Sequence, residues 1–431
     1  MRQILDLHIH SKYSRACSPN LTLANIDAAC RVKGVDIIAT GDFTYPAWFS
    51  EIGDQLSEIP SASSFGSAQD RSGQAGLYKL KTADDDGVKF ILSTELALIY
   101  KSGDRARRIH LVVHAPNIKA VQELNDFLDK KYNIRSDGRP ILGMSAVELF
   151  KLCLSIHPQF LIYPAHIWTP WFSVFGSKSG FDKLEECFGK YTNQVYALET
   201  GLSSDPEMNW RVSALDRLAI ISNSDAHSLT NIAREANLFE LENISYDEIF
   251  QAIKNKDLSK VKGTIEFYPE EGMYHYDGHR ECGVVMSPAE SRKKKGICPV
   301  CKKPLTIGVA ARVEELADRP EGFMPEQKAG FIKLVELDKI IAEALGVKSR
   351  HSKQVAAEYN RMIKSIGNEL SILLDTDIGE IKKATSPEIA EGIRRVRAGE
   401  LSIKPGFDGQ YGQISIFRPE ESPAGKQNKL F

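Results

Sequence analysis

The chain has 431 residues, a formal net charge of −2 and 42% hydrophobic residues, values that are ordinary for a soluble globular protein of two or three domains. The near-neutral charge excludes a general attraction to nucleic acid, and the lack of any apolar run of about 18 residues excludes a membrane-spanning segment. Seven cysteines, together with a first segment that lacks a signal peptide's apolar core, are typical of a cytoplasmic protein.

Short apolar runs alternate with helical patterns from residue 1 to residue 265. This alternation predicts an α/β domain with a largely parallel sheet that closes into a β/α barrel. The carboxyl ends of barrel strands form the active site, and most of these runs end near an ionisable residue. Residues 51–88 interrupt the pattern, and their Ser/Gly-rich part predicts a loop. The expected strands are 4–7, 35–43, 89–100, 108–116, 159–167, 194–202 and 218–227, and the expected helices include 120–131 and 145–154.

A pair of histidines, His8-x-His10, follows the first apolar run. Residues two apart on a strand share a face, so both imidazoles can reach one metal ion. A second pair with the same spacing, Asp225-x-His227, ends the last run of the domain. Ligand pairs at both ends of the domain predict a metal centre built from the whole of it.

Further histidines and carboxylates follow the strands between these two pairs. One such residue alone is commonly a hydrogen-bonded structural group, but eight in order along successive strands favour a metal site. Histidine and carboxylate suit zinc, manganese or iron, and paired ions activate water and neutralise phosphate in phosphoester hydrolysis. Glu199 is expected to support the site or to act in catalysis, unless it is only structural. The candidate ligands are His8, His10, Asp42, Glu95, His110, His166, Asp225 and His227, with His114 and Cys17 as weaker candidates.

The motifs HIHSKYS, GDF, STE, RIHLVV, PAHIW and SDAH, in this order, resemble those of the polymerase and histidinol phosphatase (PHP) family. The resemblance implies a distorted β/α barrel of the PHP type with a multinuclear metal site that hydrolyses phosphoesters. Asp225 and Glu95 are the residues that we expect to be catalytic. The ligand groups implied by the resemblance are His8, His10, Glu95 and Asp225 for one ion, Glu95, His110 and His166 for a second, and Asp42 and His227 near a third.

This sequence departs from the common PHP pattern around the third ion. Many members have Thr-Asp-His where this chain has Gly41-Asp42-Phe43. Many also have a further histidine where this chain has Arg15. The departures set the third ion apart from the other two, so we expect two or three divalent ions (Zn, Mn or Mg) in the barrel.

A second metal site is predicted in residues 266–310. His279-x-x-Cys282 and Cys298-x-x-Cys301 are separated by 15 residues, a spacing that suits one tetrahedral zinc. His275 is the alternative to His279, and free thiols in a solvated loop are the alternative to any site. Four protein ligands close the coordination sphere, so this zinc would be structural and would stabilise a module that is too small for a core of its own.

Basic and aromatic residues near the two sites suggest DNA contacts. Lysines and arginines around the Cys pairs could bind phosphates, although such a run is often only solvated. Trp168 and Trp171, which follow His166, could stack on bases, or they could simply pack their loop. The basic residues are Arg292, Lys293, Lys294, Lys295, Lys302 and Lys303.

Residues 311–403 have helical patterns and are expected to form an accessory DNA-binding region, followed by a flexible tail over 404–431. Within that tail, QISIF resembles the peptide that docks bacterial proteins on the β sliding clamp, and the final QNKLF is a poorer copy. QISIF could instead be a strand that closes the IKPGFDGQYG unit. The predicted clamp-binding residues are Gln413, Ile414, Ser415, Ile416 and Phe417.

The order of barrel, GHREC…GICPVC module, RVEELADRP segment and IKPGFDGQYG resembles the endonuclease Q family over nearly the full length. The resemblance implies a metal-dependent DNA repair endonuclease that nicks DNA 5′ to deaminated bases (uracil, hypoxanthine, xanthine) or abasic sites. One alternative is a small-molecule phosphoesterase such as histidinol phosphatase, which would need neither module. The other is a non-catalytic adaptor that binds lesions or a clamp, although eight intact ligands argue against it.

Overall fold

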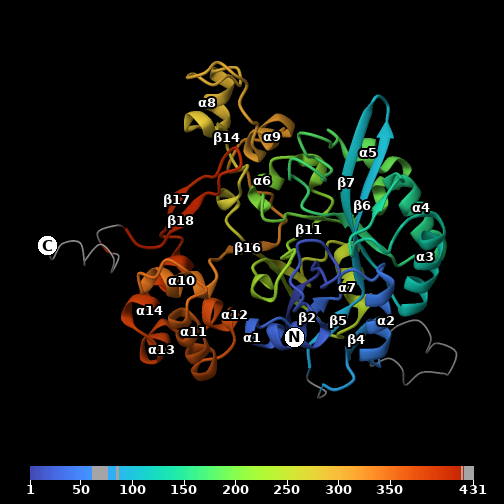
Figure 1. Cartoon of the computed structure of the whole chain (residues 1–431), viewed down its shortest axis with the longest axis horizontal. Coiled ribbons are helices and arrows are strands. Elements are labelled where there is room, and N and C mark those ends of the chain that lie inside the picture. Colours follow the sequence, from blue (N-terminus) through green and yellow to red (C-terminus); the bar gives the residue numbers. More distant parts are fainter. Residues whose placement is uncertain (61–75, 84–86, 419–420, 422–431) are drawn as a thin grey trace.

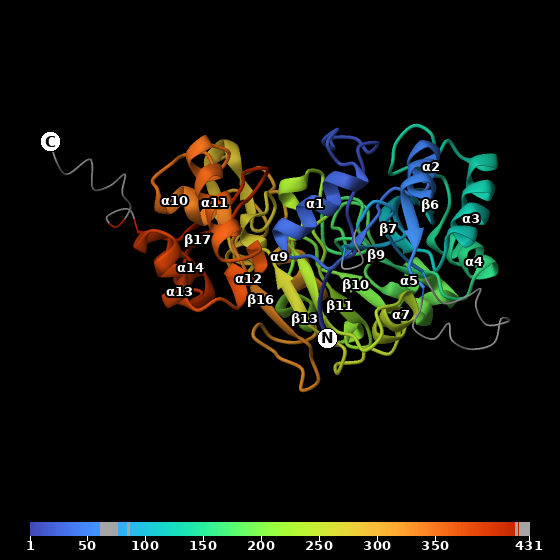
Figure 2. The same ribbon diagram turned by 90° about the horizontal axis from the view of Figure 1, so that it is seen from below.

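The computed structural model describes residues 1–60, 76–83, 87–418 and 421. Figure 1 shows a large α/β body, a small module that projects from it, and a separate cluster of helices beside it. Turning the molecule by 90° shows the helical cluster at one end and the body at the other (Figure 2). None of the helices in the described part of the chain could span a membrane.

The largest sheet of the body starts from the N-terminus. β1 pairs in parallel with β2 and antiparallel with β12, and β2 pairs in parallel with β5. The sheet is therefore mixed, because antiparallel strands extend its short centre of parallel strands. Its order is β16 (Gly330–Lys333), β13 (Val261–Glu266), β12 (Ala236–Glu240), β1 (Arg2–Asp6), β2 (Ile37–Ala39), β5 (Lys89–Ile91), β4 (Leu77–Leu80) and β3 (Leu56–Glu58).

The other strands of the body form two smaller sheets. A long antiparallel hairpin of β6 (Ser93–Ser102) and β7 (Arg105–His114) is flanked by β8 (Ile141–Leu142) and β9 (Leu161–Pro164). β10 (Ala197–Glu199) pairs only with β11 (Ala219–Ile221). The α/β class is confirmed, but the described strands pair in separate sheets and not as one closed parallel barrel.

Helices cover the body as the sequence pattern predicts. The expected helices 120–131 and 145–154 are present as α3 (Ile118–Lys131) and α4 (Ala146–Ile156), and a Ser145–Glu148 capping box starts α4. The interval 51–88 is not all loop, since it contains the end of α2 and strands β3 and β4; its residues 61–75 and 84–86 lie outside the described part. The remaining helices of the body are α1 (Leu23–Lys33), α2 (Pro46–Gln55), α5 (Leu184–Phe188), α6 (Pro206–Trp210) and α7 (Tyr246–Lys254), with short 3-10 turns at 189–194, 213–215, 229–231 and 269–271.

The projecting module contains the predicted zinc ligands. It consists of the hairpin β14 (Asp277–His279) and β15 (Val284–Met286), a 3-10 turn at 280–282 and helix α8 (Pro288–Lys293). Helix α9 (Val309–Leu316) follows and fixes the module to the body. The nearly buried Arg312 of α9 donates hydrogen bonds to the carbonyl oxygens of Phe175 and Phe181.

The helical cluster begins later than the sequence pattern suggests. Residues 330–333 form β16 at the edge of the large sheet, so the chain belongs to the body until residue 335. A well-buried ion pair of 2.7 Å between Lys33 of α1 and Glu369 of α12 joins cluster and body. The cluster comprises α10 (Leu337–Ala344), α11 (Lys353–Ser365), α12 (Glu369–Leu374), α13 (Ile378–Ala384) and α14 (Pro387–Ala398).

The segment predicted to bind a sliding clamp is folded, which corrects the prediction of a flexible tail for residues 404–418; apart from residue 421, the rest of that tail lies outside the described residues. Gln413, Ile414 and Ser415 form β18 (Gln413–Ser415), which pairs with β17 (Ser402–Lys404). Ile416 and Phe417 are 3% and 9% exposed, and their backbone amides donate to Glu343 of α10. Ile416 and Phe417, the apolar residues that would anchor the docking peptide on a clamp, are therefore already buried within this chain. The alternative prediction for QISIF, a strand, is the one observed. The second copy, QNKLF, lies outside the described residues.

Candidate metal centre

His8, His10 and Asp225, which follow the ends of β1 and β11, lie together with Glu95, which is within β6. One ligand atom of each lies within 4.8 Å of the others. A bridge between Ile9 and Ala226 brings the segment after β1 to the segment after β11. As a result, Nε2 of His10 lies 3.2 Å from Oε2 of Glu95 and 3.1 Å from Oδ1 of Asp225. Both predicted ligand pairs contribute to this first group.

The ligand atoms of the first group are unsatisfied within the protein. Nε2 of His8, Nε2 of His10 and Oδ1 of Asp225 are buried and accept or donate no hydrogen bond among the described residues. Buried polar atoms nearly always have a partner. A divalent cation between them would supply it, and the nitrogen and oxygen donors suit such an ion.

A second group consists of Glu95, His110 and His166. Oε1 of Glu95 lies 2.6 Å from Nδ1 of His110, on the adjacent strand, and 3.1 Å from Nε2 of His166, which follows β9. Its other oxygen, Oε2, faces the first group. Glu95 thus has one oxygen on each group, the arrangement of a carboxylate that bridges two metal ions.

Carboxylates behind the histidines orient them. Oε2 of Glu199 lies 3.0 Å from Nδ1 of His8, and Oδ1 of Asp42 lies 3.0 Å from Nδ1 of His10. These contacts leave both Nε2 atoms free to face the centre of the group. Burial alone would lower the pKa of His8, but the negative charges of Glu199 and Glu95 raise it well above its usual value. Glu199 is therefore an orienting residue.

Asp42 and His227 do not complete a third group of ligands in the described part of the chain. The Asp42 carboxylate accepts hydrogen bonds from His10, Ser11 and Ser14, which leaves it little capacity for an ion. The ring of His227 packs on that of His10 at 4.6 Å. Asp42 thus lies behind His10, and its predicted role as a ligand of a third ion stays a prediction.

The two departures from the PHP pattern are accounted for by this arrangement. Phe43 is completely buried in the core. Arg15 is exposed and pairs with Asp137. Neither position offers a ligand atom to the centre.

Arg139 is a member of the site that the sequence analysis missed. Its Nη1 lies 2.9 Å from Oε2 of Glu95, and together with His110 it holds the pKa of Glu95 well below its usual value against the effect of burial. The preceding Gly138 approaches Asp42 so closely that a Cβ there would lie 2.4 Å from Oδ2. No residue pattern marks this loop, so only the tertiary structure reveals it.

Three residues of the site have left-handed backbone conformations. The φ angles are 47° for Asp42, 31° for His166 and 45° for Asp225. Such angles strain a residue with a side chain, least for Asp and more for His. The turns at the strand ends are therefore held by the surrounding structure.

The weaker candidates lie outside both groups. His114 is buried, its Nε2 lies 3.0 Å from the Tyr163 hydroxyl, and burial lowers its pKa to about 3. Cys17 joins neither group of ligands in the described residues. Neither of these weaker candidates therefore belongs to a group of ligand atoms in the described residues.

The four residues predicted to bind structural zinc also come together. His279, Cys282, Cys298 and Cys301 offer ligand atoms within 4.8 Å of one another, and Sγ of Cys301 lies 3.7 Å from Nδ1 of His279. Burial acts to raise the pKa of Cys298, but backbone amides of Cys301 and Val300 lower it overall, which favours a thiolate. His275 is not a member of this group, so the geometry favours His279.

Solved structures of endonuclease Q share this architecture. The crystal structure of the lesion-specific endonuclease PfuEndoQ from Pyrococcus furiosus matches with a TM-score of 0.82 and 30% identity, covering 96% of this chain and 95% of that one. This chain belongs to the endonuclease Q family. A structure of endonuclease Q in complex with a 27-mer duplex that has an abasic lesion at the active site matches with the same score and identity, covering 98% of each chain.

Two further similarities concern parts of the chain. The model of the MJ0043 C-terminal domain matches residues 336–400, which coincide with the helical cluster. Protein MJ0043 of Methanocaldococcus jannaschii, which is described as uncharacterized, is 34% identical over 260 residues, or 59% of this chain. The chain spans about a third of that relative's length, 32%.

The basic residues of this endonuclease Q family member lie on the projecting module. Lys293, Lys294 and Lys295 are exposed around the end of α8, and Lys303 is exposed beside the Cys pairs. The other two have partners within the protein: the Arg292 guanidinium binds Glu314, and the Lys302 amine donates to the carbonyl of Pro299. The lysines after α8 are thus the freest cations of this set.

The two tryptophans have different environments, which corrects one prediction. Trp168 is fully buried, and its indole donates a hydrogen bond of 2.8 Å to Asn209, so it cannot stack on a base. Trp171 is 40% exposed and contacts Tyr274 edge-on at the rim of the site. Loop packing is therefore the role of Trp168, whereas Trp171 remains accessible.

Proposed function

We propose that this chain is a metal-dependent DNA repair endonuclease that hydrolyses the phosphodiester 5′ to a deaminated base or an abasic site. Membership of the endonuclease Q family supports DNA as the substrate, and one relative was solved with an abasic duplex. The observation that carries the proposal is Glu95, which has one oxygen on each of two adjacent ligand groups.

The two groups support a pair of ions in the body, and the module supports one structural zinc. Divalent ions bound there would activate water and offset the charge that develops on the phosphate. Histidine with carboxylate ligands favours zinc or manganese, although magnesium is an alternative.

The protein's own residues perform the remaining tasks. Glu199 and Asp42 fix the rings of His8 and His10, so that little reorganisation is needed during the reaction. The side chain of Asp225 is 24% exposed, so that its carboxylate can hold an ion at the open side of the centre, next to the substrate. The guanidinium of Arg139 is the nearest fixed cation to Glu95 and can bind a phosphate oxygen.

The DNA would extend from the metal centre towards the projecting module. Lys293, Lys294 and Lys295 could bind backbone phosphates there, and Trp171 could contact an unstacked base at the rim. The helical cluster over 336–400 would serve as an accessory region. These contacts would position the duplex without reading its sequence.

The experiment is a nicking assay with Mg²⁺, Mn²⁺ or Zn²⁺ on duplexes that contain one uracil, hypoxanthine, xanthine or abasic site. We expect a single nick 5′ to the lesion and none in the matched undamaged duplex. Equal cleavage of both duplexes, or no cleavage with any ion, would contradict the proposal. Hydrolysis of histidinol phosphate without DNA cleavage would instead indicate a small-molecule phosphoesterase.

A further inference from the structure

The outer half of the β6–β7 hairpin extends beyond the other strands of its sheet, and one side of it contacts residues 176–180 of the body. β8 pairs only with Ala97 and Leu98 of β6, and β9 pairs only with residues 111–114 of β7. Residues 99–108, here called the hairpin arm, therefore have no strand neighbour beyond the hairpin itself in the described part of the chain, and Figure 1 shows the tip of the hairpin projecting from the molecule. Tyr100 of the arm packs against the core, but most of its other residues are exposed and accessible to a partner.

The hairpin arm is strongly basic. It contains Lys101, Arg105, Arg107 and Arg108 against one acidic residue, Asp104. Lys101, Arg105 and Arg108 are exposed, and across the described ranges no ion pair or side-chain hydrogen bond of these three is found. Arg107 differs, because its guanidinium donates to the carbonyl of Gly180 and lies over the ring of Phe181 at 4.1 Å.

Strand alternation divides these cations between two faces. Ala97 pairs with the metal-site residue His110, Ile99 pairs with Arg108, and Lys101 pairs with Ala106. Paired residues share a face, and so do residues two apart. Arg108 and Lys101 therefore lie on the same face as Glu95 and His110, whereas Arg105 and Arg107 lie on the other face.

The spacing along the metal-centre face suits a nucleic acid backbone. At about 3.4 Å per residue, Arg108 lies about 7 Å and the Lys101 position about 14 Å beyond His110 along the strand. A phosphodiester strand carries one charge per 3.4 Å of helix axis, so that every second phosphate is about 7 Å further along the axis. Cations spaced this way can each meet a phosphate that follows the one held at the metal centre.

The opposite face is less suited to an anion. Arg105 and Arg107 line a cleft of about 610 Å³ there with Lys178, Arg312, Asp182 and Glu315. The two carboxylates pair with Arg312 and offset part of the positive charge. The more favourable surface for DNA is thus the face shared with the metal centre.

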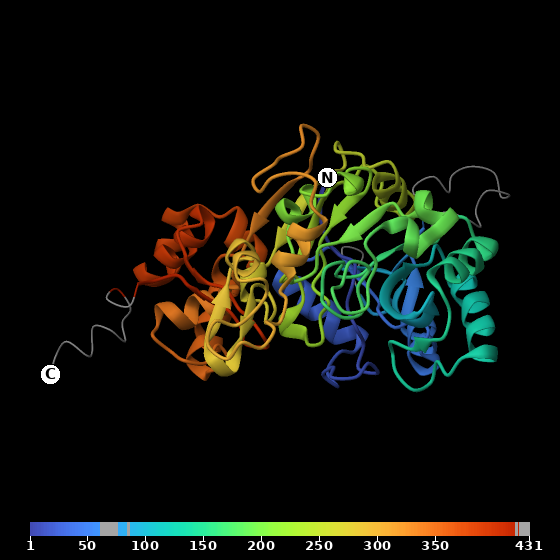
Figure 3. The same cartoon turned by 90° about the horizontal axis from the view of Figure 1, so that it is seen from above.

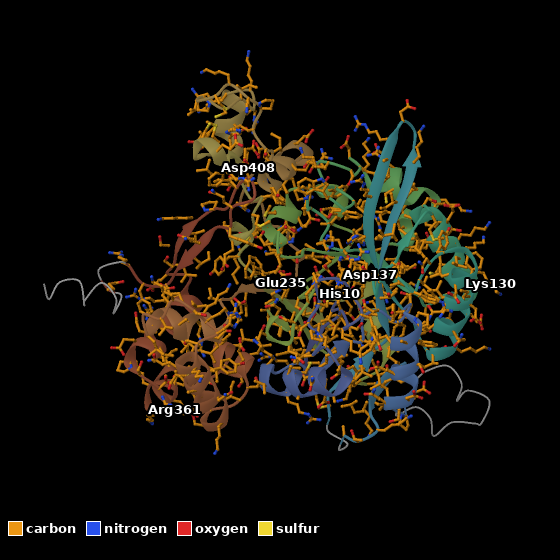
Figure 4. All side chains as sticks on the ribbon, viewed as in Figure 1. His10, Lys130, Asp137, Glu235, Arg361 and Asp408 are labelled. Atoms are coloured by element: carbon orange, nitrogen blue, oxygen red, sulfur yellow. The ribbon has the colours of Figure 1, made fainter. Side chains whose placement is uncertain are left out.

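We propose that the hairpin arm binds backbone phosphates of the DNA strand that flanks the scissile bond, through Lys101 and Arg108. This inference rests on the proposed endonuclease function. It places phosphate contacts on the arm side of the metal centre, away from the projecting module, since the module and the arm lie apart in Figures 1 and 3 and His10 lies between them across the view of Figure 4. The duplex would then be held on both sides of the lesion.

The test is the double substitution Lys101→Gln with Arg108→Gln in the full-length, metal-loaded enzyme, with nicking of a uracil duplex as the readout. We expect KM to rise about tenfold with kcat within twofold, and the dependence of log(kcat/KM) on log[salt] to flatten by about 1.8, or 0.9 for each lost phosphate contact. The matched controls are Arg105→Gln on the opposite face of the arm and Lys130→Gln on α3, which Figure 4 shows far from His10. Both controls should keep the wild-type KM and salt slope.

A second measurement uses duplexes that are shortened on one side of the lesion. Removal of the arm-side flank should lower the affinity of the wild-type enzyme for the duplex. On this shortened duplex, the wild type and the double variant should have the same affinity. An unchanged KM and slope in the double variant, or an equal effect of Arg105→Gln, would overturn the arm proposal. If the wild-type enzyme nicks no lesion duplex at all, the proposed function fails instead, so the two failures are distinguishable.

Discussion

The metal centre of the body and the Cys/His cluster of the module are built in different ways. Ligands of the metal centre come from strands and strand ends spread between His8 and Asp225, and buried carboxylates orient two of them, His8 and His10, from behind. Ligands of the module come from 23 consecutive residues, His279 to Cys301, and three of them are thiols. One site needs the whole body to assemble, whereas the other assembles locally.

This difference teaches what each metal contributes. Ligands that a large fold holds in place can leave ion coordination open for a substrate, as hydrolysis requires. A local set of four ligands closes around its ion and contributes mainly folding free energy. The two sites should therefore fail differently when a single ligand is removed.

The largest effect is expected from Asp225→Asn in the metal centre. The substitution keeps the size and the left-handed backbone of the residue but removes a charged ligand atom. We expect the nicking rate to fall about 10³-fold, or about 4 kcal/mol in activation free energy, while DNA binding survives. Single-turnover nicking and fluorescence anisotropy measure the two quantities. Asp126→Asn on α3 is the matched control. Loss of DNA binding together with activity would contradict the expectation that the substitution affects the nicking rate alone.

The second-largest effect on activity is expected from Cys301→Ser in the module. Loss of one thiolate should release the structural zinc and unfold the module, because little else stabilises it. Metal analysis should give one zinc fewer per chain with the ions of the body retained. We expect DNA affinity to fall at least tenfold with little change in the rate for bound substrate. Loss of all metal from the protein would show that the two sites are not independent.

A smaller effect is expected from Glu199→Gln behind His8. Gln can still accept from Asn223, but it no longer offers a negative charge to Nδ1 of His8. Such substitutions behind metal ligands typically cost 10- to 100-fold in metal affinity. Activity titrated against the divalent ion should therefore shift to higher metal concentration and recover at saturation. Activity that does not recover would mean that Glu199 acts in catalysis itself.

The smallest effect concerns two buried carboxyls, Glu235 and Glu266, that belong to neither ligand group in the described residues. Registers of β12 and β13 bring Glu235 opposite Glu266, and both are fully buried. Burial and the neighbouring carboxyl raise the pKa of Glu235 well above its usual value, and burial raises that of Glu266 to about 8. Both carboxyls therefore stay protonated in the folded chain at pH values where the unfolded chain releases its protons. The free energy of unfolding must fall as pH rises from the ordinary carboxyl pKa towards pH 8.

Glu235→Gln removes one of these acids. We expect it to raise the free energy of unfolding at pH 8 by on the order of 1–2 kcal/mol and to leave it unchanged at pH 4. Thermal melts of the variant and of wild type at both pH values measure the difference. Equal stabilisation at pH 4 and pH 8 would mean that packing, and not ionisation, is responsible.

Part of the metal centre is predictable from the sequence because His8, His10, His166 and Asp225 follow the ends of strands, whereas Glu95 and His110 lie within the β6–β7 hairpin. The apolar run before His8-x-His10 and the run before Asp225-x-His227 fix both the strands and the direction of the side chains. The short gaps in His279-x-x-Cys282 and Cys298-x-x-Cys301 predict the module for a similar reason. In each case a local pattern determines the geometry.

Other features depend on contacts between distant segments and are not visible in any local pattern. Arg139 reaches Glu95 from a loop without a motif, and Asp42 accepts hydrogen bonds from Ser11 and Ser14. The pentapeptide that begins at Gln413 resembles a docking peptide in sequence, but its two anchor residues, Ile416 and Phe417, pack on the helical cluster. Separate pairing of β10 with β11 likewise follows from long-range packing.

The left-handed conformation of His166 has a consequence for attempts to make the protein more heat-resistant. A glycine at this position would relieve the backbone strain, yet it would also delete a nitrogen from the second ligand group. Selection for thermal stability alone would therefore favour substitutions that disable the enzyme. A directed-evolution campaign would have to score nicking in every round to keep this residue in place.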